Sequence, residues 1–273
     1  MSDYKNDSEI SHINRDGFKW AVEVSESTYH VLQRSIEFSE LTGGAFDITV
    51  GPLVDVYRSA ENNGVAPSKD EIAQAKMKVG FEKLHLDDES KTVKFAVEGM
   101  RLDLGGIAKG YAIDKAVEAM RKCGASGGMV DIGGDIRCFG TPPKGRDHWL
   151  IGVQDPNVTN DDIATGQLLS TLKLTNAAVA TSGGYRRFVL IDGKKYSHII
   201  DTNRGSSASE LASVTIISKD AITADALATA VSVIGREKGL ALIEKMPETE
   251  AILISSQPEY KLVKTGGTEN FLK

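Results

Sequence analysis

Two stretches of the sequence bring together residue types that could bind a phosphorylated ligand and a metal ion. In the first, Arg101–Lys115, an alternating apolar run predicts the end of a strand, and Gly105-Gly106 follow it. A helical pattern then runs to Lys122, and Gly124 ends it. Such a junction lets the backbone approach a ligand and points free N–H groups and the helix dipole at it, which suits an anion.

The first stretch fits neither of two familiar phosphate loops. A Walker loop needs Lys and then Ser or Thr after its last glycine, but Tyr111 follows Gly110. The dinucleotide fingerprint needs G-x-G-x-x-G, whereas this stretch has G-G-x-x-x-G. From these residues alone, two interpretations stay open: a loop for a polar ligand and a structural turn.

The second stretch, Ala224–Ala230, is strongly helical by propensity and carries Asp225 and Thr229 four residues apart. This spacing puts the carboxylate and the hydroxyl on one helix face. Both are hard oxygen ligands that suit Mg²⁺ when a phosphate completes the coordination shell. The alternative is an alanine-rich packing helix whose Asp near the N-terminus complements the helix dipole.

Composition narrows the class of protein. The chain has 273 residues with 26% charged and 41% hydrophobic residues, as in ordinary globular proteins with a sizeable core. A net charge of -6 argues against nucleic acid as a partner, and two cysteines are too few for a disulfide framework or a zinc site. No apolar run predicts a membrane span and no targeting segment is visible, so we expect a cytoplasmic protein or one whose export segment was removed.

The order of predicted elements favours an α+β fold with a mainly antiparallel sheet and inserted helices. Strands are predicted in consecutive pairs, with helices between the groups. A capping box at Ser68–Glu71 predicts a helix that runs to Gly80, and Asp192-Gly193 predicts a hairpin between Phe188–Ile191 and Tyr196–Ile200. Thr42–Leu53 is expected to be a loop. Since no shift in composition marks a boundary, we expect residues 1–273 to form one domain.

Several motifs, taken in order, resemble the ApbE family of FAD:protein FMN transferases, whose fold is α+β and similar to the tunnelling fold. The resemblance runs from about residue 4 to the end, and any single motif is weak while the ordered set is specific. The matching segments are Gly43–Thr49 with Gly51–Leu53, Leu102–Ala112, Gly133–Ile136, Thr181–Gly183, Ser197–Asp201 and Ala224–Ala230.

The resemblance implies a reaction and its partners. Such enzymes split the pyrophosphate of FAD with Mg²⁺, move the FMN half to a threonine hydroxyl of an acceptor protein as a phosphoester, and release AMP. Known acceptors are subunits of the sodium-pumping NADH:quinone reductase and of Rnf-type complexes. Family members usually act on the periplasmic side of the inner membrane, which leaves the localisation of this chain open.

The resemblance also assigns roles to residues by position. Metal ligands would be the side chains of Asp225 and Thr229 and the main-chain carbonyls near Gly106 and Ala228. The positions that match FAD contacts are Tyr4, Ala45, Phe46, Asp47, Asp103, Lys109 and Ile199. Physically, Tyr4 could stack on a ring, Asp47 or Asp103 could accept a hydrogen bond from the nucleoside, and Lys109 could offset pyrophosphate charge.

His198 is the candidate proton acceptor for the incoming threonine hydroxyl, and its alternative is a strand histidine with one backbone hydrogen bond. The sequence departs from the family twice. The family's N-terminal strand and helix, with a Met-Gly-Thr motif, have no counterpart before Tyr4. The usual Pro-Arg-Thr-Gly after the His-Ile-Ile-Asp run is replaced by Thr202-Asn203-Arg204-Gly205.

Four functions therefore compete. The first is the Mg²⁺-dependent flavin transferase, with Asp225 and His198 in catalytic roles. The second is an FAD pyrophosphatase that gives FMN and AMP, the third a flavin-binding protein without chemistry, and the fourth an inactive relative. Asp225 and Thr229 argue against simple flavin binding, because that needs no metal.

Overall fold

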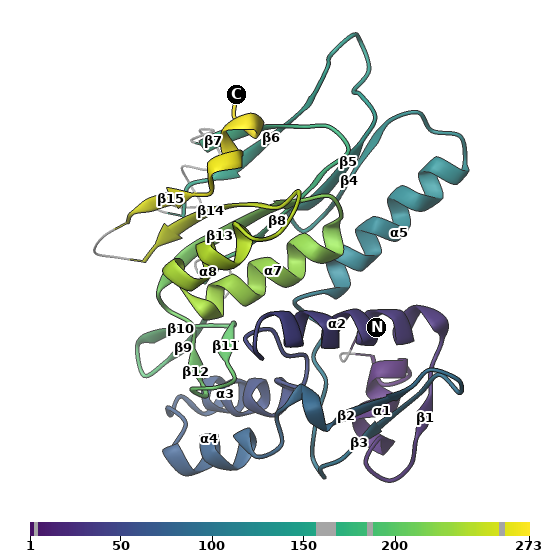
Figure 1. Ribbon diagram of the computed structural model, residues 1–273. Helices are drawn as coiled ribbons and strands as arrows, with labels where there is room; N and C mark the ends of the chain where they lie inside the picture. The colour runs from purple at the N-terminus through teal and green to yellow at the C-terminus, as the bar shows by residue number, and fades with distance from the viewer. Residues whose placement is uncertain (3–4, 157–167, 185–187, 257–259) are drawn as a thin grey trace. The chain divides into compact units, whose positions relative to one another are not determined.

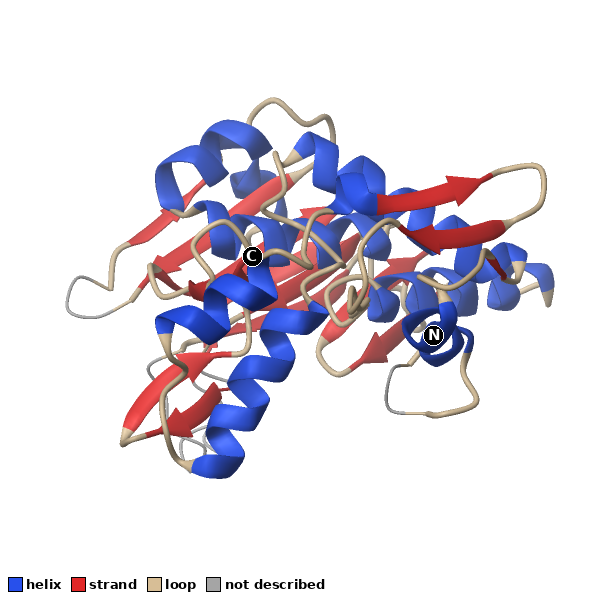
Figure 2. Cartoon of the chain, turned by 90° about the horizontal axis from the view of Figure 1, so that it is seen from below, coloured by secondary structure: helices blue, strands red, loops and turns tan. Residues whose placement is uncertain are grey.

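The computed structural model describes residues 1–2, 5–156, 168–184, 188–256 and 260–273, and these divide into two compact units. The first unit comprises Met1–Ala108 and Arg187–Ala208, and the second comprises Lys109–Arg186 and Ser209–Lys273. The described residues form both helices and strands (Figure 2), and each unit contains elements of both kinds. All strand pairs among the described residues are antiparallel, which confirms the predicted α+β class.

In the first unit, short sheets accompany a set of helices (Figure 1). Its helices are α1 (Glu9–Asp16), α2 (Glu26–Leu41), α3 (Gly51–Asn63), α4 (Lys69–Lys76) and the 3-10 turn η1 (Phe81–Lys83). Its strands are β1 (Val22–Glu23), β2 (Leu84–Asp87), β3 (Thr92–Phe95), β9 (Phe188–Ile191), β10 (Lys194–Ser197), β11 (Ile200–Asp201) and β12 (Ser206–Ser207). They form the sheet β1-β3-β2 and the hairpins β9-β10 and β11-β12. One core cluster joins α3 and α4 to β9 and β11 through Leu53, Tyr57, Ala60, Ala75, Val79, Ile191 and Ile200.

The second unit is built on a six-stranded antiparallel sheet in the order β15-β14-β13-β8-β5-β4. Its elements are α5 (Ala108–Lys122, which begins on the last residue of the first unit), β4 (Gly128–Ile132), β5 (Asp135–Phe139), β6 (Trp149–Gln154), β7 (Leu168–Leu174), β8 (Ala178–Ser182), β13 (Leu211–Ser218), α7 (Ala221–Ile234), α8 (Arg236–Ile243), β14 (Glu250–Ser255), β15 (Leu262–Lys264) and the 3-10 turn η2 (Gly266–Phe271). The β6-β7 pair packs on one side of the sheet, and α7 and α8 lie on the other (Figure 1). Because side chains alternate along β13, Ile217 faces the β6-β7 pair while Ile216 faces away from it.

Local sequence signals explain several of these elements. The Ser68–Glu71 capping box is present, with Ser68 Oγ accepting from the Glu71 N–H while the Glu71 carboxylate accepts from the Ser68 N–H. The β9-β10 hairpin turns at Asp192 and Gly193, whose φ angles of 49° and 70° suit a tight two-residue turn. Gly124, with φ 87°, follows α5 where the sequence predicts its end.

Four predictions about local structure are wrong. The helix after Ser68 ends at Lys76, not Gly80, and the second hairpin strand ends at Ser197, not Ile200. The expected loop Thr42–Leu53 gives way to α3 at Gly51, because Pro52 fits the first turn of a helix that Gly64 ends in the left-handed region. The expected strand end at Arg101–Leu104 is only an isolated parallel bridge between Val50 and Arg101. The loop expected from Asp155 to Gly166 lies almost wholly outside the described residues.

Candidate functional site

The junction before α5 is a turn whose first residue is fixed at both its backbone and its carboxylate. The N–H of Asp103 donates to the Ile48 carbonyl at 2.8 Å, and the Asp103 carboxylate accepts from the Gly105 N–H at 2.8 Å. Gly106 follows as a half-buried residue just before the helix. The segment therefore pairs with the loop at Ile48 instead of a sheet, which is why the alternating apolar pattern does not yield a strand.

The N-terminal turns of α5 and α7 meet so closely that Gly110 of α5 leaves no room for a side chain. A Cβ added to Gly110 would lie 2.3 Å from the carbonyl oxygen of Ala221. The Asp114 carboxylate accepts from the N–H groups of Ala221 and Ile222, both at 2.9 Å, and pairs with Arg137 at 2.6 Å. These N–H groups in the first turn of α7 have no partner within the helix, so Asp114 both satisfies them and locks α7 to α5.

The same contact holds a cluster of three charged side chains: Lys109, Asp135 and Asp225. The Lys109 ammonium forms ion pairs with both carboxylates, at 3.3 Å from Asp225 Oδ1. The other oxygen, Asp225 Oδ2, accepts from the Gly110 N–H at 3.0 Å, so this carboxylate caps the N-terminus of α5. The sequence alternative placed Asp225 at the dipole of its own helix; the helix it caps is the neighbouring one.

Burial sets the protonation tendencies within the cluster. Asp225 is 2% exposed, and burial raises its pKa to about 6 even though Lys109 opposes the shift. Burial alone would lower the pKa of Lys109, but the carboxylates of Asp225 and Asp135 outweigh it and raise that pKa. The charged form of Lys109 is favoured because two carboxylates together outweigh its desolvation, whereas the charged form of Asp225 is disfavoured because it faces one ammonium and the second carboxylate, Asp135.

The predicted metal ligands divide between the two units. Asp225, Ala228 and Thr229 all lie on α7 in the second unit, with Thr229 half-buried one turn beyond Asp225, while Gly106 lies in the first unit. A carboxylate and a hydroxyl on one helix face fit a hard cation, and Lys109 already places a positive charge on Asp225 Oδ1. The Ala228 carbonyl fits less well, since it accepts from Ser232 Oγ at 2.8 Å. In the described part of the chain, no group of three or more His, Cys, Asp or Glu side chains could hold a metal ion.

Of the predicted flavin contacts, Ala45, Phe46 and Asp47 form a buried loop in the first unit. Phe46 packs edge-on against Phe38 with ring centroids 6.1 Å apart. The Asp47 carboxylate accepts from the Thr49 N–H and hydroxyl at 2.8 and 2.7 Å and from the Phe81 N–H at 3.0 Å, and burial raises its pKa. Asp103 contacts the same loop through Ile48. Lys109 is in the second unit, and Tyr4 lies outside the described residues.

His198 and Ile199 lie between β10 and β11, so His198 is not the strand residue of the alternative interpretation. The His198 side chain is exposed, while Ile199 is buried and its carbonyl accepts from the Ala208 N–H at 2.9 Å. The segment that follows, Thr202–Gly205, departs from the family pattern and is held by a hydrogen bond to another loop. Its Thr202 hydroxyl donates to the Gly44 carbonyl at 3.0 Å, which places this segment beside the loop that holds Asp47.

Asp135 is the charged residue of the cluster that sequence reasoning missed. It follows the Gly133-Gly134 turn and begins β5, and its side chain is 3% exposed. The available signal was the Gly133–Ile136 motif, which matches the family but gave the aspartate no predicted role. Its partner Lys109 is 26 residues away in the sequence, so no local spacing pointed to the pair.

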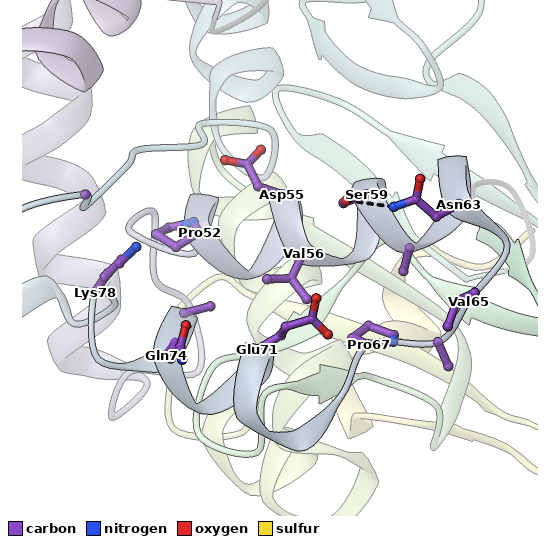
Figure 3. Close-up of a pocket in the computed structure, with 14 residues that line it drawn as sticks. Pro52, Asp55, Val56, Ser59, Asn63, Val65, Pro67, Glu71, Gln74 and Lys78 are labelled. Carbon is purple, nitrogen blue, oxygen red and sulfur yellow. Dashed lines mark hydrogen bonds between the residues drawn. The ribbon is translucent and has the colours of Figure 1, made fainter.

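A separate groove of about 590 Å³ lies in the first unit, between α3 and α4 (Figure 3). Asp55, Ser59 and Asn63 reach it from α3, and Glu71 and Gln74 reach it from α4 (Figure 3). Of the predicted site residues that the structure describes, none lines this groove. Its polar groups are engaged locally, with Glu71 in the capping box and Asn63 donating to Ser59 at 3.4 Å.

Comparisons with known proteins agree on one family. The model of the ApbE family matches residues 1–253. A FAD:protein FMN transferase of Vibrio cholerae is 32% identical over 275 residues, covering 100% of this chain and 80% of the relative. One from Treponema pallidum is 33% identical over 267 residues, covering 93% and 72%.

Solved structures give the same result. An ApbE protein from Thermotoga maritima superimposes with a TM-score of 0.87 at 34% identity, covering 100% of this chain and 86% of that one. The flavin transferase ApbE from Vibrio cholerae gives a TM-score of 0.84 at 30% identity, covering 100% and 85%. Among the described helices, none combines the length and the apolar composition needed to cross a membrane.

Proposed function

Because this chain belongs to the ApbE family, we propose that it moves the FMN half of FAD to a threonine hydroxyl of an acceptor protein with Mg²⁺ as cofactor. By homology it is an enzyme, a FAD:protein FMN transferase. The observation that best supports the finer proposal is the buried Asp225 on α7, with Thr229 one turn on and Lys109 against its carboxylate. Since the family match draws on both units, we propose that residues 1–273 act as one domain.

In the proposed reaction the threonine oxygen attacks the phosphorus of the FMN half. The bond from that phosphorus to the bridging pyrophosphate oxygen breaks, AMP leaves with the oxygen, and the hydroxyl proton passes to a base. His198 is the proposed base, and its exposure leaves its ring accessible to a protein substrate. Little covalent work falls to the protein, so its task is to align the hydroxyl and to neutralise charge.

Asp225 and Thr229 would hold the metal, with the main-chain carbonyls of Gly106 and Ala228 as further ligands. Bound there, the ion would supply Lewis-acid stabilisation of the phosphate oxygens. Lys109, which is half-exposed beside Asp225, would lie close enough to offset pyrophosphate charge.

Six other residues carry the proposed FAD contacts. Asp103 and Asp47 would accept from the nucleoside, although both Asp47 oxygens already hold the Thr49 and Phe81 groups. Ala45, Phe46 and Ile199 are buried, so their contribution would come from shaping the pocket and from backbone contacts. Tyr4 would supply a stacking face. The acceptor would be a subunit of a sodium-pumping NADH:quinone reductase or an Rnf-type complex.

The test is an incubation with FAD, with and without Mg²⁺, and with and without an acceptor domain that carries the modifiable threonine. A matched acceptor with valine at that position serves as the control. We expect AMP, and a fluorescent acceptor band in a denaturing gel, only with both Mg²⁺ and the threonine.

The other outcomes separate the competing functions. AMP and free FMN without a band would instead establish a pyrophosphatase. Intact FAD in every tube, with tight flavin binding, would leave a flavin-binding protein.

A further inference from the structure

The three-charge cluster has an unusual balance. The Asp135 and Asp225 side chains are each 3% exposed, and Lys109 is the cation that contacts both. Buried carboxylates need compensating charge, because their transfer out of water is costly. Two carboxylates against one ammonium leave the cluster short of one positive charge.

The two carboxylates hold Lys109 in different ways. Asp135 is fixed to the sheet, since its Oδ1 accepts from the Thr181 N–H of β8 at 3.2 Å while its Oδ2 pairs with Lys109. Asp225 is fixed through Oδ2 by the Gly110 N–H, and its Oδ1 faces only the lysine in the contacts described. The oxygen of Asp225 that a metal ion would take is therefore the one that the ammonium now occupies.

From this arrangement we propose that Lys109 is an internal counter-ion for Asp225 in the metal-free protein, and that Asp135 is the positioning residue that retains Lys109 when a divalent cation takes Asp225 Oδ1. The inference rests on the proposed metal site. It adds that Asp135 controls the competition between an ammonium and a metal ion for one oxygen. It also explains how Lys109 remains close to the substrate's phosphates after the exchange, because its second partner does not leave.

The proposal makes opposite predictions for the two partners. In Asp135→Asn, Lys109 loses its alternative charged partner and stays on Asp225, so metal binding should weaken by about tenfold. Asparagine keeps an oxygen for the Thr181 N–H, so the strand contact survives. In Lys109→Met the competitor is gone, and metal binding should be tighter than in the wild type.

The experiment measures Mn²⁺ binding by EPR on the full chain without FAD, since Mn²⁺ accepts the same oxygen ligands as Mg²⁺. Wild type, the two single variants and the double variant form a cycle. If Asp135 acts through Lys109, the Asp135→Asn substitution should cost little affinity in the Lys109→Met background. Asp131→Asn is the matched control, because it removes the same charge from an exposed position in the same hairpin.

Equal weakening in both backgrounds would overturn the proposal, because Asp135 would then act as a general negative charge. Wild-type Mn²⁺ affinity in Asp135→Asn, or no Mn²⁺ binding by the wild type, would overturn it too. The covalent-flavin assay on the same wild-type protein reports the proposed function separately. If the protein transfers flavin but the Mn²⁺ affinities of the four variants do not follow the expected cycle, only the role of Asp135 is wrong. If the protein neither binds Mn²⁺ nor transfers flavin, both proposals are wrong.

Discussion

Asp47 in the first unit and Asp225 in the second are both buried carboxylates whose pKa burial raises, but their partners differ in kind. Asp47 is satisfied by neutral donors, the N–H groups of Thr49 and Phe81 and the Thr49 hydroxyl. Asp225 is satisfied by one backbone N–H and by the ammonium of Lys109. Neutral backbone donors cannot leave without unfolding the loop, whereas an ammonium on a flexible four-carbon chain can exchange for another cation.

The kind of partner therefore distinguishes a structural carboxylate from a functional one when both are buried. Asp47 uses its charge to hold the loop at residues 45–49 against η1, so its loss should be felt as stability. Asp225 uses one oxygen to cap α5 and leaves the other to a replaceable cation, so its loss should be felt mainly as metal-dependent activity. Substitutions at the two sites can break this distinction.

The largest expected effect is on turnover in Asp225→Asn. Metal stabilisation of phosphate charge is worth several kcal/mol, so we expect Mg²⁺-dependent FAD cleavage to fall by about a thousandfold. FAD binding, followed by quenching of flavin fluorescence, should change much less than turnover. Asp131→Asn, which makes the same change of charge at an exposed position of the β4-β5 hairpin, is the matched control. Near-normal turnover in Asp225→Asn would remove Asp225 from the metal site.

The next effect is a loss of stability in Gly110→Ala. The new methyl group would lie 2.3 Å from the Ala221 carbonyl oxygen and 2.6 Å from its carbon, both backbone atoms that cannot rotate away. Helices α5 and α7 must separate, which we expect to cost about 3 kcal/mol or more in the free energy of unfolding. Gly266→Ala, where no atom lies within 4 Å of the added Cβ, is the control for chemical denaturation. Equal denaturation midpoints for Gly110→Ala and Gly266→Ala would show that α5 and α7 are not in such close contact.

The sequence could predict elements that carry their own local chemistry. The Ser68 capping box, the Asp192-Gly193 hairpin and the end of α5 at Gly124 each depend on residues within a few positions. The start of helix α3 was not predicted, because Val50 at its N-cap makes no side-chain hydrogen bond. Strand β6, with Gly152 near its centre, was also not predicted.

For the candidate site, the spacing of Asp225 and Thr229 correctly gave one helix. The site's charge partners could not be found in this way, because they depend on tertiary contacts. Lys109 meets Asp135 across 26 residues and Asp225 across 116, and no periodicity reports such contacts. The donors to Asp47 could not all be predicted from the sequence either, since the Phe81 N–H comes from 34 residues away.

Asp47→Asn should have a smaller effect than the helix clash, and it should lower stability without changing metal binding. The amide oxygen can still accept from Thr49, but the amide NH₂ would then face the Phe81 N–H, leaving two donors opposed. We expect a loss of about 1–3 kcal/mol in the free energy of unfolding. Mn²⁺ affinity measured on the folded protein should equal that of the wild type. A changed Mn²⁺ affinity with unchanged stability would reverse the roles assigned to the two carboxylates.

The last expected effect is in the pH dependence of stability without metal. The pKa of Asp225 is about 6 in the folded protein against an ordinary value of 3.8, so the folded state binds its proton more tightly. Its contribution to stability is then full below pH 3.8 and is lost as the pH rises to about 6. In EDTA, the free energy of unfolding of the wild type relative to Asp225→Asn should therefore fall between pH 4.5 and 7. If this difference in the free energy of unfolding did not depend on pH, Lys109 would fully offset the burial of Asp225. The Asp225 carboxylate would then be held by its partners as firmly as that of Asp47.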